Sequence, residues 1–148
     1  MEHKRELMQG GGEKAIAEQH QNGKQTARER IAALLDEGSF MEMDTFVRSR
    51  CGTEAPCEGV VTGFGTVDAR SVCVIAEDFT VMGGSMSEAH AKKICKVLDM
   101  AVKTGVPVVT LADTAGARVQ EGLLAMDAYA QVMSRAAKAS GMIPQITV

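Results

Sequence analysis

The sequence VPVVTLADTAGARVQEG, residues 106–122, joins an apolar run to a turn of small residues and then to a helical pattern. An apolar run that ends in such a turn is typical of a buried strand followed by a loop and a helix N-terminus. Backbone N–H groups at a helix start have no intrahelical partner, and the partial positive charge there favours an anion. Residues 113–122 are therefore predicted to form a functional loop that can stabilise an oxyanion.

The succession of a strand and a small-residue loop occurs twice in the chain. The strand predicted at residues 72–76 leads to Asp78 and a glycine pair, as the run at residues 106–111 leads to Asp113 and Gly116. Apolar residues at helical spacing lie between the two repeats and predict a helix. Strands that alternate with helices imply parallel pairing and right-handed crossovers, so we expect an α/β fold.

Two amphipathic helices are predicted from the spacing of apolar residues. The first begins near Ser87 and ends at Gly105, with Pro107 just beyond it. The second covers residues 121–140 and precedes a predicted strand at residues 143–148. The apolar face expected for the second helix consists of Leu124, Ala128, Met133 and Ala137.

The residues before the first repeat divide into an arm and the start of a folded domain. Residues 1–23 have the pattern of a charged helical arm interrupted by three consecutive glycines, and we place them outside the core. The domain is expected to occupy residues 24–148. It begins with a helix that Thr26 and Glu29 start as a capping box and that Gly38 ends.

The segment after this helix has the patterns of strands and turns. Alternation of apolar and polar residues at 40–46 predicts a half-buried strand, and residues 48–56 are expected to form a loop. Residues 59–66 and 71–76 then predict a β-hairpin with its turn at residues 68–70.

Composition argues against several classes of function. A net charge of -3, a pI near 5.6, no Trp and one Tyr argue against a nucleic-acid-binding surface. No apolar stretch approaches the about 20 residues of a membrane span, and the polar start lacks the apolar region of a signal peptide. We therefore expect a cytoplasmic protein with no nucleic-acid partner and no direct membrane insertion.

The cysteines and histidines do not have the spacing of a metal site. The four cysteines form no CxxC pair and the three histidines are scattered, so no zinc site is expected. Cys73 lies in an apolar strand pattern and Cys95 on an apolar helix face. Free cysteines in such places usually serve as small hydrophobic residues, so both are predicted to pack in the core.

The repeat also indicates that an element is missing. If each strand is followed by a loop and a helix, the strand that ends at Val148 lacks both. An uncovered apolar strand would be an exposed edge, so we expect the chain to be a fragment or to need another polypeptide.

Five segments of the sequence occur in an order and at a spacing typical of one protein family. They are GKQTARERIAALLDEGSF, GVVTGFGTVDAR, EDFTVMGGSMSEAHAKKI, DTAGARVQEG and SGMIPQITV. Over residues 23–148 the chain resembles the carboxyltransferase subunits of biotin-dependent acyl-CoA carboxylases and decarboxylases, of the propionyl-CoA and methylmalonyl-CoA type. The resemblance covers the front part of a family member. It implies a crotonase-like (ClpP/crotonase) α/β fold of stacked strand-strand-helix units, present here as an incomplete domain.

The resemblance implies the transfer of a carboxyl group between carboxybiotin and an acyl-CoA thioester. In the family, the biotin enolate removes the α-proton of the thioester, and the thioester enolate attacks the released carbon dioxide. Decarboxylating members run the reaction in reverse. Because biotin is carried by a partner protein or domain, the resemblance also implies a biotin carboxyl carrier and biotin carboxylase or decarboxylase subunits as partners. It further implies that this chain forms a homo-oligomer.

The resemblance assigns the first half of the predicted loop to an oxyanion hole for the thioester enolate. The N–H groups of Gly116 and Ala117 supply part of this hole, with Ala115 adjacent, and its other donors lie beyond Val148. Each well-aimed donor can be worth roughly 3 kcal/mol, because the negative charge develops on the thioester oxygen.

Four positions differ from the usual family pattern. Thr114, Ala115 and Val119 stand where the family motif DSGGARIQEG has Ser, Gly and Ile, and Ala69 replaces a hairpin glycine. If the loop needs a positive φ at Ala115, the Cβ costs about 1–2 kcal/mol and re-aims the donors. At Ala69 only the geometry of the turn is affected.

Four residues are candidate contacts of the CoA substrate. Gly83, Gly84 and Ser85 precede the first predicted helix and can approach the CoA, but tight strand-to-helix packing explains small residues there equally well. Arg118 can hold a CoA phosphate. We favour the alternative that it forms a structural pair with a carboxylate, since Glu121 is close in sequence.

The polar residues of the first predicted helix have simple interpretations. His90 has no nucleophile near it in sequence and is interpreted as a surface or capping residue. Lys92, Lys93 and Lys96 are expected to form a solvated helix face.

Two other functions remain open from the sequence. A non-catalytic remnant or assembly module of a carboxylase or decarboxylase complex would keep the start of the fold and offer its open sheet edge to a partner. A crotonase-like hydratase or hydrolase would need a placed carboxylate pair or a nucleophile. The acidic residues near the loop in sequence are Asp113, Glu121 and Asp127, and no such pair is evident.

Overall fold

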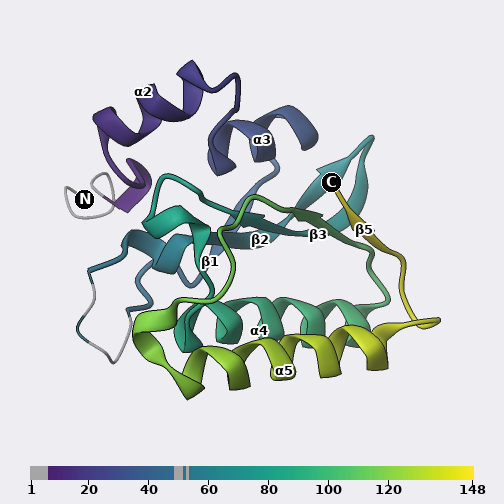
Figure 1. Cartoon of the computed structure of the whole chain (residues 1–148). Helices are drawn as coiled ribbons and strands as arrows, with labels where there is room; N and C mark the ends of the chain where they lie inside the picture. Colours follow the sequence, from purple (N-terminus) through teal and green to yellow (C-terminus); the bar gives the residue numbers. More distant parts are fainter. Residues whose placement is uncertain (1–6, 49–51, 53) are drawn as a thin grey trace.

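A five-stranded sheet with its strands in sequence order forms the centre of the structure (Figure 1). The computed structural model describes residues 7–48, 52 and 54–148. The strands are β1 (Met41–Met43), β2 (Val60–Val67), β3 (Arg70–Glu77), β4 (Val108–Leu111) and β5 (Gln145–Thr147). Strands β1, β2 and β3 pair antiparallel, and β3, β4 and β5 pair parallel, as the alternation of strands and helices predicted.

Helices cover both faces of this sheet. On one face, α4 (Glu88–Thr104) and α5 (Leu123–Ala139) lie side by side as the connections between the parallel strands (Figure 1). On the other face lies α3 (Ala27–Leu34), with α2 (Glu13–Gln21) beyond it. Short 3-10 turns, η1 (Pro56–Gly59), η2 (Met82–Gly84) and η3 (Val119–Glu121), precede β2, α4 and α5.

The ends of α3 and α4 are fixed by residues that the sequence marks clearly. The Thr26 hydroxyl accepts the Glu29 N–H and the Glu29 carboxylate accepts the Thr26 N–H, which completes the predicted capping box. Ser87 accepts the His90 N–H at the start of α4, and Gly105 ends that helix with a φ of 71°. Both helix starts and the end of α4 are confirmed.

Two predicted boundaries in the first half of the chain were wrong. Helix α3 ends at Leu34, before the Gly38 that we expected to end it. The strand predicted at residues 40–46 is reduced to β1, because Asp44 has a φ of 57° and no longer follows the extended ladder. Part of the loop predicted at residues 48–56 lies outside the described residues.

The β2–β3 hairpin turns in two residues, Asp68 and Ala69, which both have positive φ, 49° and 62°. Two positive values are typical of the type I′ turn, whose twist matches that of the strands. The Asp36 carboxylate accepts both turn N–H groups at 3.0 and 2.9 Å and also the Thr66 hydroxyl. Because these hydrogen bonds favour the charged form, they lower the pKa of Asp36.

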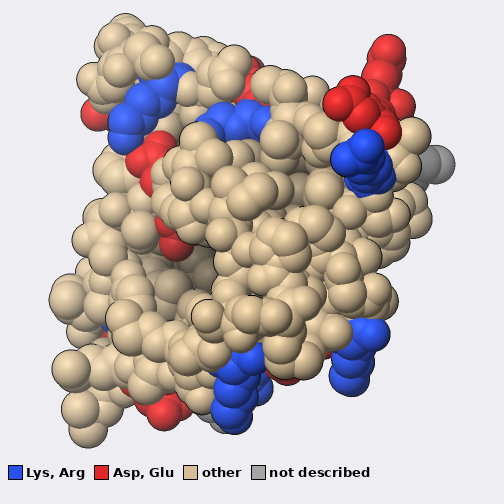
Figure 2. All heavy atoms as spheres, turned by 90° about the vertical axis from the view of Figure 1, so that its right-hand side faces the viewer, with Lys and Arg blue, Asp and Glu red and all other residues tan. Residues whose placement is uncertain are grey.

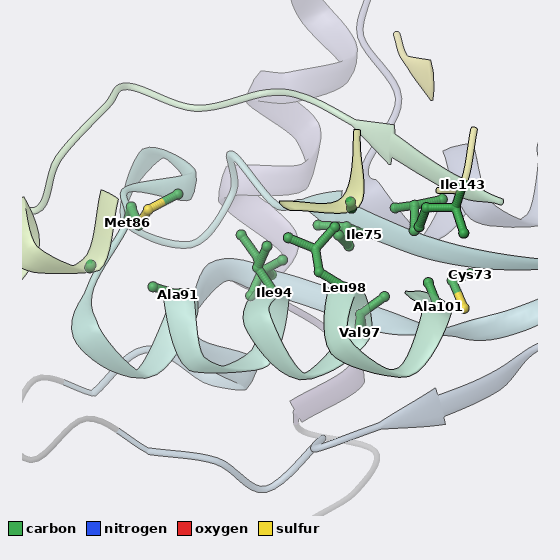
Figure 3. Packing of buried hydrophobic residues seen from close by; sticks show 13 residues of the cluster. Cys73, Ile75, Met86, Ala91, Ile94, Val97, Leu98, Ala101 and Ile143 are labelled. Carbon is green, nitrogen blue, oxygen red and sulfur yellow. The ribbon is translucent and has the colours of Figure 1, made fainter. Parts of the chain in front are cut away.

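Two apolar clusters, one on each face of the sheet, form the core. The larger cluster joins β3 to α4 through residues such as Ile75, Ile94 and Leu98 (Figure 3). Cys73 belongs to this cluster and Cys95 is also buried, as predicted. The second cluster packs α3 against the opposite face of the sheet.

The apolar face predicted for α5 was largely wrong. Leu124 and Met133 are 42% and 66% exposed, and Ala137 is also exposed. The buried positions of this helix are Ala125, Ala128 and Ala139. Ala128 and Ala139 belong to the same apolar cluster as residues of α4. A short side chain lets two helix axes approach closely, and hydrophobicity alone does not show which residues do so.

The edge strand β5 exposes apolar side chains. Ile146 is 50% exposed and Val148 is 68% exposed. On the side of the molecule that includes β5, charged side chains lie mainly toward the upper and lower margins, and uncharged residues form its middle (Figure 2). No helix among the described residues has the length and apolar character needed to cross a membrane.

We predict that Ala69→Gly stabilises the chain by about 1 kcal/mol, because it removes a Cβ from a left-handed position. Urea unfolding followed by circular dichroism measures this change. The matched control is Ala130→Gly, an exposed position inside α5, where the same substitution should destabilise by about 1 kcal/mol. Equal signs for the two variants would contradict the assigned turn.

Candidate functional site

The two small-residue loops predicted from the repeat lie against each other. The Ala115 N–H donates to the Gly83 carbonyl at 2.8 Å, and the Thr114 hydroxyl donates to the Gly84 carbonyl at 2.7 Å. A Cβ at Gly84 would lie 2.4 Å from the Asp113 carbonyl oxygen, so only glycine permits this contact. The loop at residues 113–122 is therefore held by η2 from the preceding repeat.

A second set of backbone bonds extends this contact toward α4. The Met86 N–H donates to the Gly116 carbonyl, and the Arg118 N–H donates to the Met86 carbonyl, both at 2.9 Å. These bonds make a single parallel bridge between Met86 and Ala117. The bridge uses the Gly116 carbonyl and the Arg118 N–H, the backbone groups on either side of Ala117, so the Ala117 N–H itself points away from Met86.

The three candidate residues of the oxyanion hole differ in whether their N–H groups are free. The Ala115 N–H is engaged by Gly83, and the Gly116 N–H donates to the Thr114 hydroxyl oxygen at 3.1 Å. The Ala117 N–H has no acceptor among the described residues, and Ala117 is exposed. Ala117 is thus the candidate donor that a ligand can reach without displacing another contact.

The strain anticipated at Ala115 does not arise. Ala115 is not among the residues with positive φ, whereas Gly116 has a φ of 101°. The position that needs glycine is therefore Gly116, which the sequence retains, and the alanine at 115 fits its backbone.

The side chain of Arg118 lies inside the protein. Its Nη1 is 2.8 Å from the Glu58 carboxylate and 3.7 Å from that of Glu121, and the residue is 1% exposed. A buried guanidinium cannot reach the phosphate of a substrate at the surface, so the CoA-phosphate contact is not supported. The structural alternative agrees with these contacts, but Glu58 is the closer partner rather than Glu121.

Arg118 also explains why a serine is buried at position 85. The Ser85 hydroxyl accepts from the Arg118 Nε at 3.3 Å, and its carbonyl accepts from Nη2 at 3.2 Å. Ser85 is 8% exposed, and Gly83 and Gly84 have φ values of 64° and 60°. Loop-to-loop packing explains these three residues, and an approach of the CoA to them stays a prediction.

The buried carboxylate of Glu58 was missed by sequence reasoning. Glu58 is 0% exposed and accepts a hydrogen bond from the Ser87 hydroxyl at 2.8 Å in addition to the Arg118 contact. It lies in a turn where Cys57, Glu58 and Gly59 all have positive φ. Nothing in the sequence marks this turn except the glycine, because its partners come from 29 and 60 positions away.

Two predictions for α4 were wrong. His90, expected at the surface or as a cap, is 0% exposed. Lys93, expected on a solvated face with Lys92 and Lys96, is 1% exposed and donates to the carbonyls of Cys57 and Val60. Burial lowers the pKa of Lys93. Lys93 lies between the exposed Lys92 and Lys96 in the sequence, so the pattern of charges did not indicate that Lys93 is buried.

Asp113, at the start of the loop, contacts Gln19 of the N-terminal arm and Lys24, the first residue of the predicted domain. The Asp113 carboxylate accepts from the Gln19 side chain and from the Lys24 ammonium, both at 2.8 Å. Lys24 also lies 5.1 Å from the centre of the Phe79 ring. Neither core cluster includes a described residue of the arm. This agrees with an arm outside the core but does not test the boundary at residue 23, so the division into an arm and a domain stays a prediction.

The architecture defines the class of protein. A mixed sheet with α4 and α5 as parallel crossovers, and a loop that presents a free backbone N–H after β4, is the α/β arrangement expected for a crotonase-like fold. The chain belongs to the carboxyl transferase domain family, whose model matches residues 18–148.

Individual relatives agree with this assignment. The chain is 54% identical over 145 residues to the propionyl-CoA carboxylase beta chain of Cereibacter sphaeroides, covering 94% of this chain and 28% of that protein. It is 51% identical over 150 residues to the methylmalonyl-CoA decarboxylase subunit alpha of Propionigenium modestum, covering 97% and 29%.

A solved structure supports the fold. A transcarboxylase 12S with methylmalonyl-coenzyme A and methylmalonic acid bound is similar with a TM-score of 0.97 and 40% identity. The similarity covers 99% of this chain and 30% of that one. The crotonase-like fold is thereby confirmed. The chain spans less than a third of the length of these relatives.

We predict that Arg118→Met destabilises the chain by about 3–5 kcal/mol, because it leaves the Glu58 carboxylate buried without its cation. The matched control is Arg135→Met, which breaks a partly exposed pair with Asp99 and should cost less than about 1 kcal/mol. Urea unfolding measures both. A cost for Arg118→Met no larger than that of the control would contradict the role assigned to the buried pair.

We also predict that Lys24→Met loosens the start of the loop. Lys24 is 52% exposed, and such a pair is worth about 0.2–1 kcal/mol, so amide exchange at Asp113 should accelerate by at most about fivefold. Lys14→Met, at an exposed position in α2, should leave this exchange unchanged. Hydrogen exchange read by NMR distinguishes the two, and equal exchange rates in the variants would contradict the contact.

Proposed function

We propose that the chain supplies the acyl-CoA part of a carboxyltransferase site that acts on propionyl-CoA or methylmalonyl-CoA. The observation that carries the proposal is the exposed Ala117 N–H, which has no acceptor among the described residues and lies in a loop fixed from several sides. Family membership supports the reaction class, and the named relatives act on these two thioesters.

The loop is suited to stabilise a thioester enolate. The Ala117 N–H would donate to the thioester oxygen, where negative charge develops when the α-proton leaves. The Gly116 N–H is a second donor, which becomes available once the Thr114 hydroxyl rotates or shifts. Because the bonds to Gly83 and Met86 hold the loop in place, the Ala117 N–H needs little reorganisation during the reaction.

The remaining parts of the reaction would come from outside this chain. Biotin, attached to a carrier protein or domain, supplies or accepts the carboxyl group when bound. We propose biotin carboxyl carrier and biotin carboxylase or decarboxylase subunits as partners, a homo-oligomeric assembly, and a cytoplasmic location. The transcarboxylase 12S relative forms a hexamer, which supports the oligomeric part of the proposal.

A second candidate function is an assembly module. The exposed apolar side chain of Ile146 on the edge strand β5 favours it, because an exposed edge strand can pair with another polypeptide. In this case the chain would join a carboxylase or decarboxylase complex without contributing to the reaction.

A chimera tests the enzymatic proposal. In it, this chain replaces the matching segment of the Cereibacter sphaeroides propionyl-CoA carboxylase beta chain, and propionyl-CoA carboxylation is measured with the complete enzyme. We expect activity in the chimera. Ala117→Pro removes the N–H and should lower kcat roughly 10²- to 10³-fold, with a smaller effect on KM.

Ala117→Ser keeps the N–H and serves as the matched control, with kcat expected within about twofold of the unsubstituted chimera. A folded, assembled chimera without activity would favour the assembly module. Equal kcat values for the proline and serine variants would remove Ala117 from the oxyanion hole.

A further inference from the structure

His90 lies in the first turn of α4 with its ring fully buried. Its Nδ1 is 2.9 Å from the Glu58 carbonyl oxygen. A carbonyl oxygen can only accept a hydrogen bond, so Nδ1 must carry a proton. This contact therefore determines that Nδ1 is protonated and leaves only the state of Nε2 to be decided.

The other ring nitrogen, Nε2, has no hydrogen-bond partner and is buried. The Glu77 Oε1 lies within ion-pair distance of it, at 3.8 Å, and the Glu77 side chain is 8% exposed. With Nδ1 protonated, a neutral ring would direct a bare nitrogen lone pair at a carboxylate. A proton on Nε2 would turn the same geometry into an ion pair.

Three buried carboxylates contact the start of α4, where His90 lies. The buried carboxylates of Glu58, Glu77 and Glu121 come from η1, β3 and η3, and Arg118 lies close to the first and the last of them. Glu77 has no ion pair to a cation other than His90 among the described residues. An unpaired buried carboxylate is costly, and an imidazolium would compensate it.

Two further groups complete the surroundings. Tyr129 of α5 has its pKa raised by burial and, to a lesser extent, by the Glu77 carboxylate, so its phenol stays neutral. On α4 itself, Lys93 is turned toward the carbonyls of Cys57 and Val60, and the Glu88 side chain binds Lys92. The contacts of both lysines are thus directed elsewhere than at Glu77.

Glu77 connects this pair to the loop. Its second oxygen, Oε2, accepts the Asp113 N–H at 3.2 Å, and Asp113 begins the loop that presents the Ala117 N–H. If the Glu77 carboxylate moves, the acceptor of the Asp113 N–H moves with it, and the start of the loop is no longer held in the same position.

We propose that His90 is a positioning residue that holds protons on both ring nitrogens and, through its ion pair with Glu77, fixes the start of the loop at residues 113–122. The ion pair and its effect on the loop follow from the contacts of Glu77 with His90 and with the Asp113 N–H. Their effect on the reaction rests on the proposed function.

NMR of the 148-residue chain labelled at the histidine ring tests the protonation state directly. At neutral pH we expect both ring nitrogens of His90 to be protonated, and a single proton, on Nδ1, in Glu77→Gln. In the unsubstituted chain, the Asp113 and Ala117 amide resonances should shift with the pH-dependent signal of His90. Asp99→Asn, which removes an exposed carboxylate from the same helix, should change none of these signals.

A neutral His90 ring in the unsubstituted chain at neutral pH would overturn the proposal, as would a ring signal unaffected by Glu77→Gln. If Glu77→Gln prevents folding, the pH titration of the unsubstituted chain decides by itself, since amide shifts at Asp113 and Ala117 that do not follow His90 would also overturn it.

The consequence for the reaction is measured separately in the chimera. Glu77→Gln should lower kcat about tenfold or more and alter its pH profile, with KM changed less, because the donors lose their aim while substrate contacts remain. An unchanged pH profile would overturn the positioning role. An inactive chimera that shows the expected ring signals would count against the proposed function and leave the ion pair established.

Discussion

The buried ion pair between Arg118 and Glu58 is the interaction on which the rest of this structure depends. It joins η1, at the entry to the sheet, to the loop that follows β4, and through Ser85 and Ser87 it also holds the segment before α4. Both partners are fully desolvated, so neither charge is tolerable without the other. The loop geometry is thereby tied to segments that are 60 residues apart in the sequence.

The sequence predicted those features that depend on local chemistry. The capping box at Thr26, the start of α4 at Ser87, its end at Gly105 and the parallel crossovers are determined by short-range patterns, and the structure contains all of them. The repeat indicated both small-residue loops, but their contact with each other appears only in the structure, where Gly84 shows why glycine is needed.

The buried polar residues could not be predicted because their partners are distant in sequence. His90 and Lys93 belong to a helix whose charge pattern indicates a solvated surface, and only the η1 turn packed against it shows why they are buried. For the candidate site, the sequence and the family resemblance indicated the loop, but the structure distinguishes the free Ala117 N–H from the engaged Gly116 N–H. Hydrogen-bond partners of this kind have no counterpart in composition or spacing.

The alanine contact between α4 and α5 has a consequence for mutational tolerance. Ala128 is 1% exposed and lies in the apolar cluster that includes residues of α4, so a larger side chain there would push α5 away from α4. Because α5 begins directly after Gly122, such a shift would reach the end of the loop at residues 113–122. The exposed Leu123 and Met126 on the same helix can vary without this effect. Sequence drift in α5 should therefore be constrained most strongly at its smallest residues.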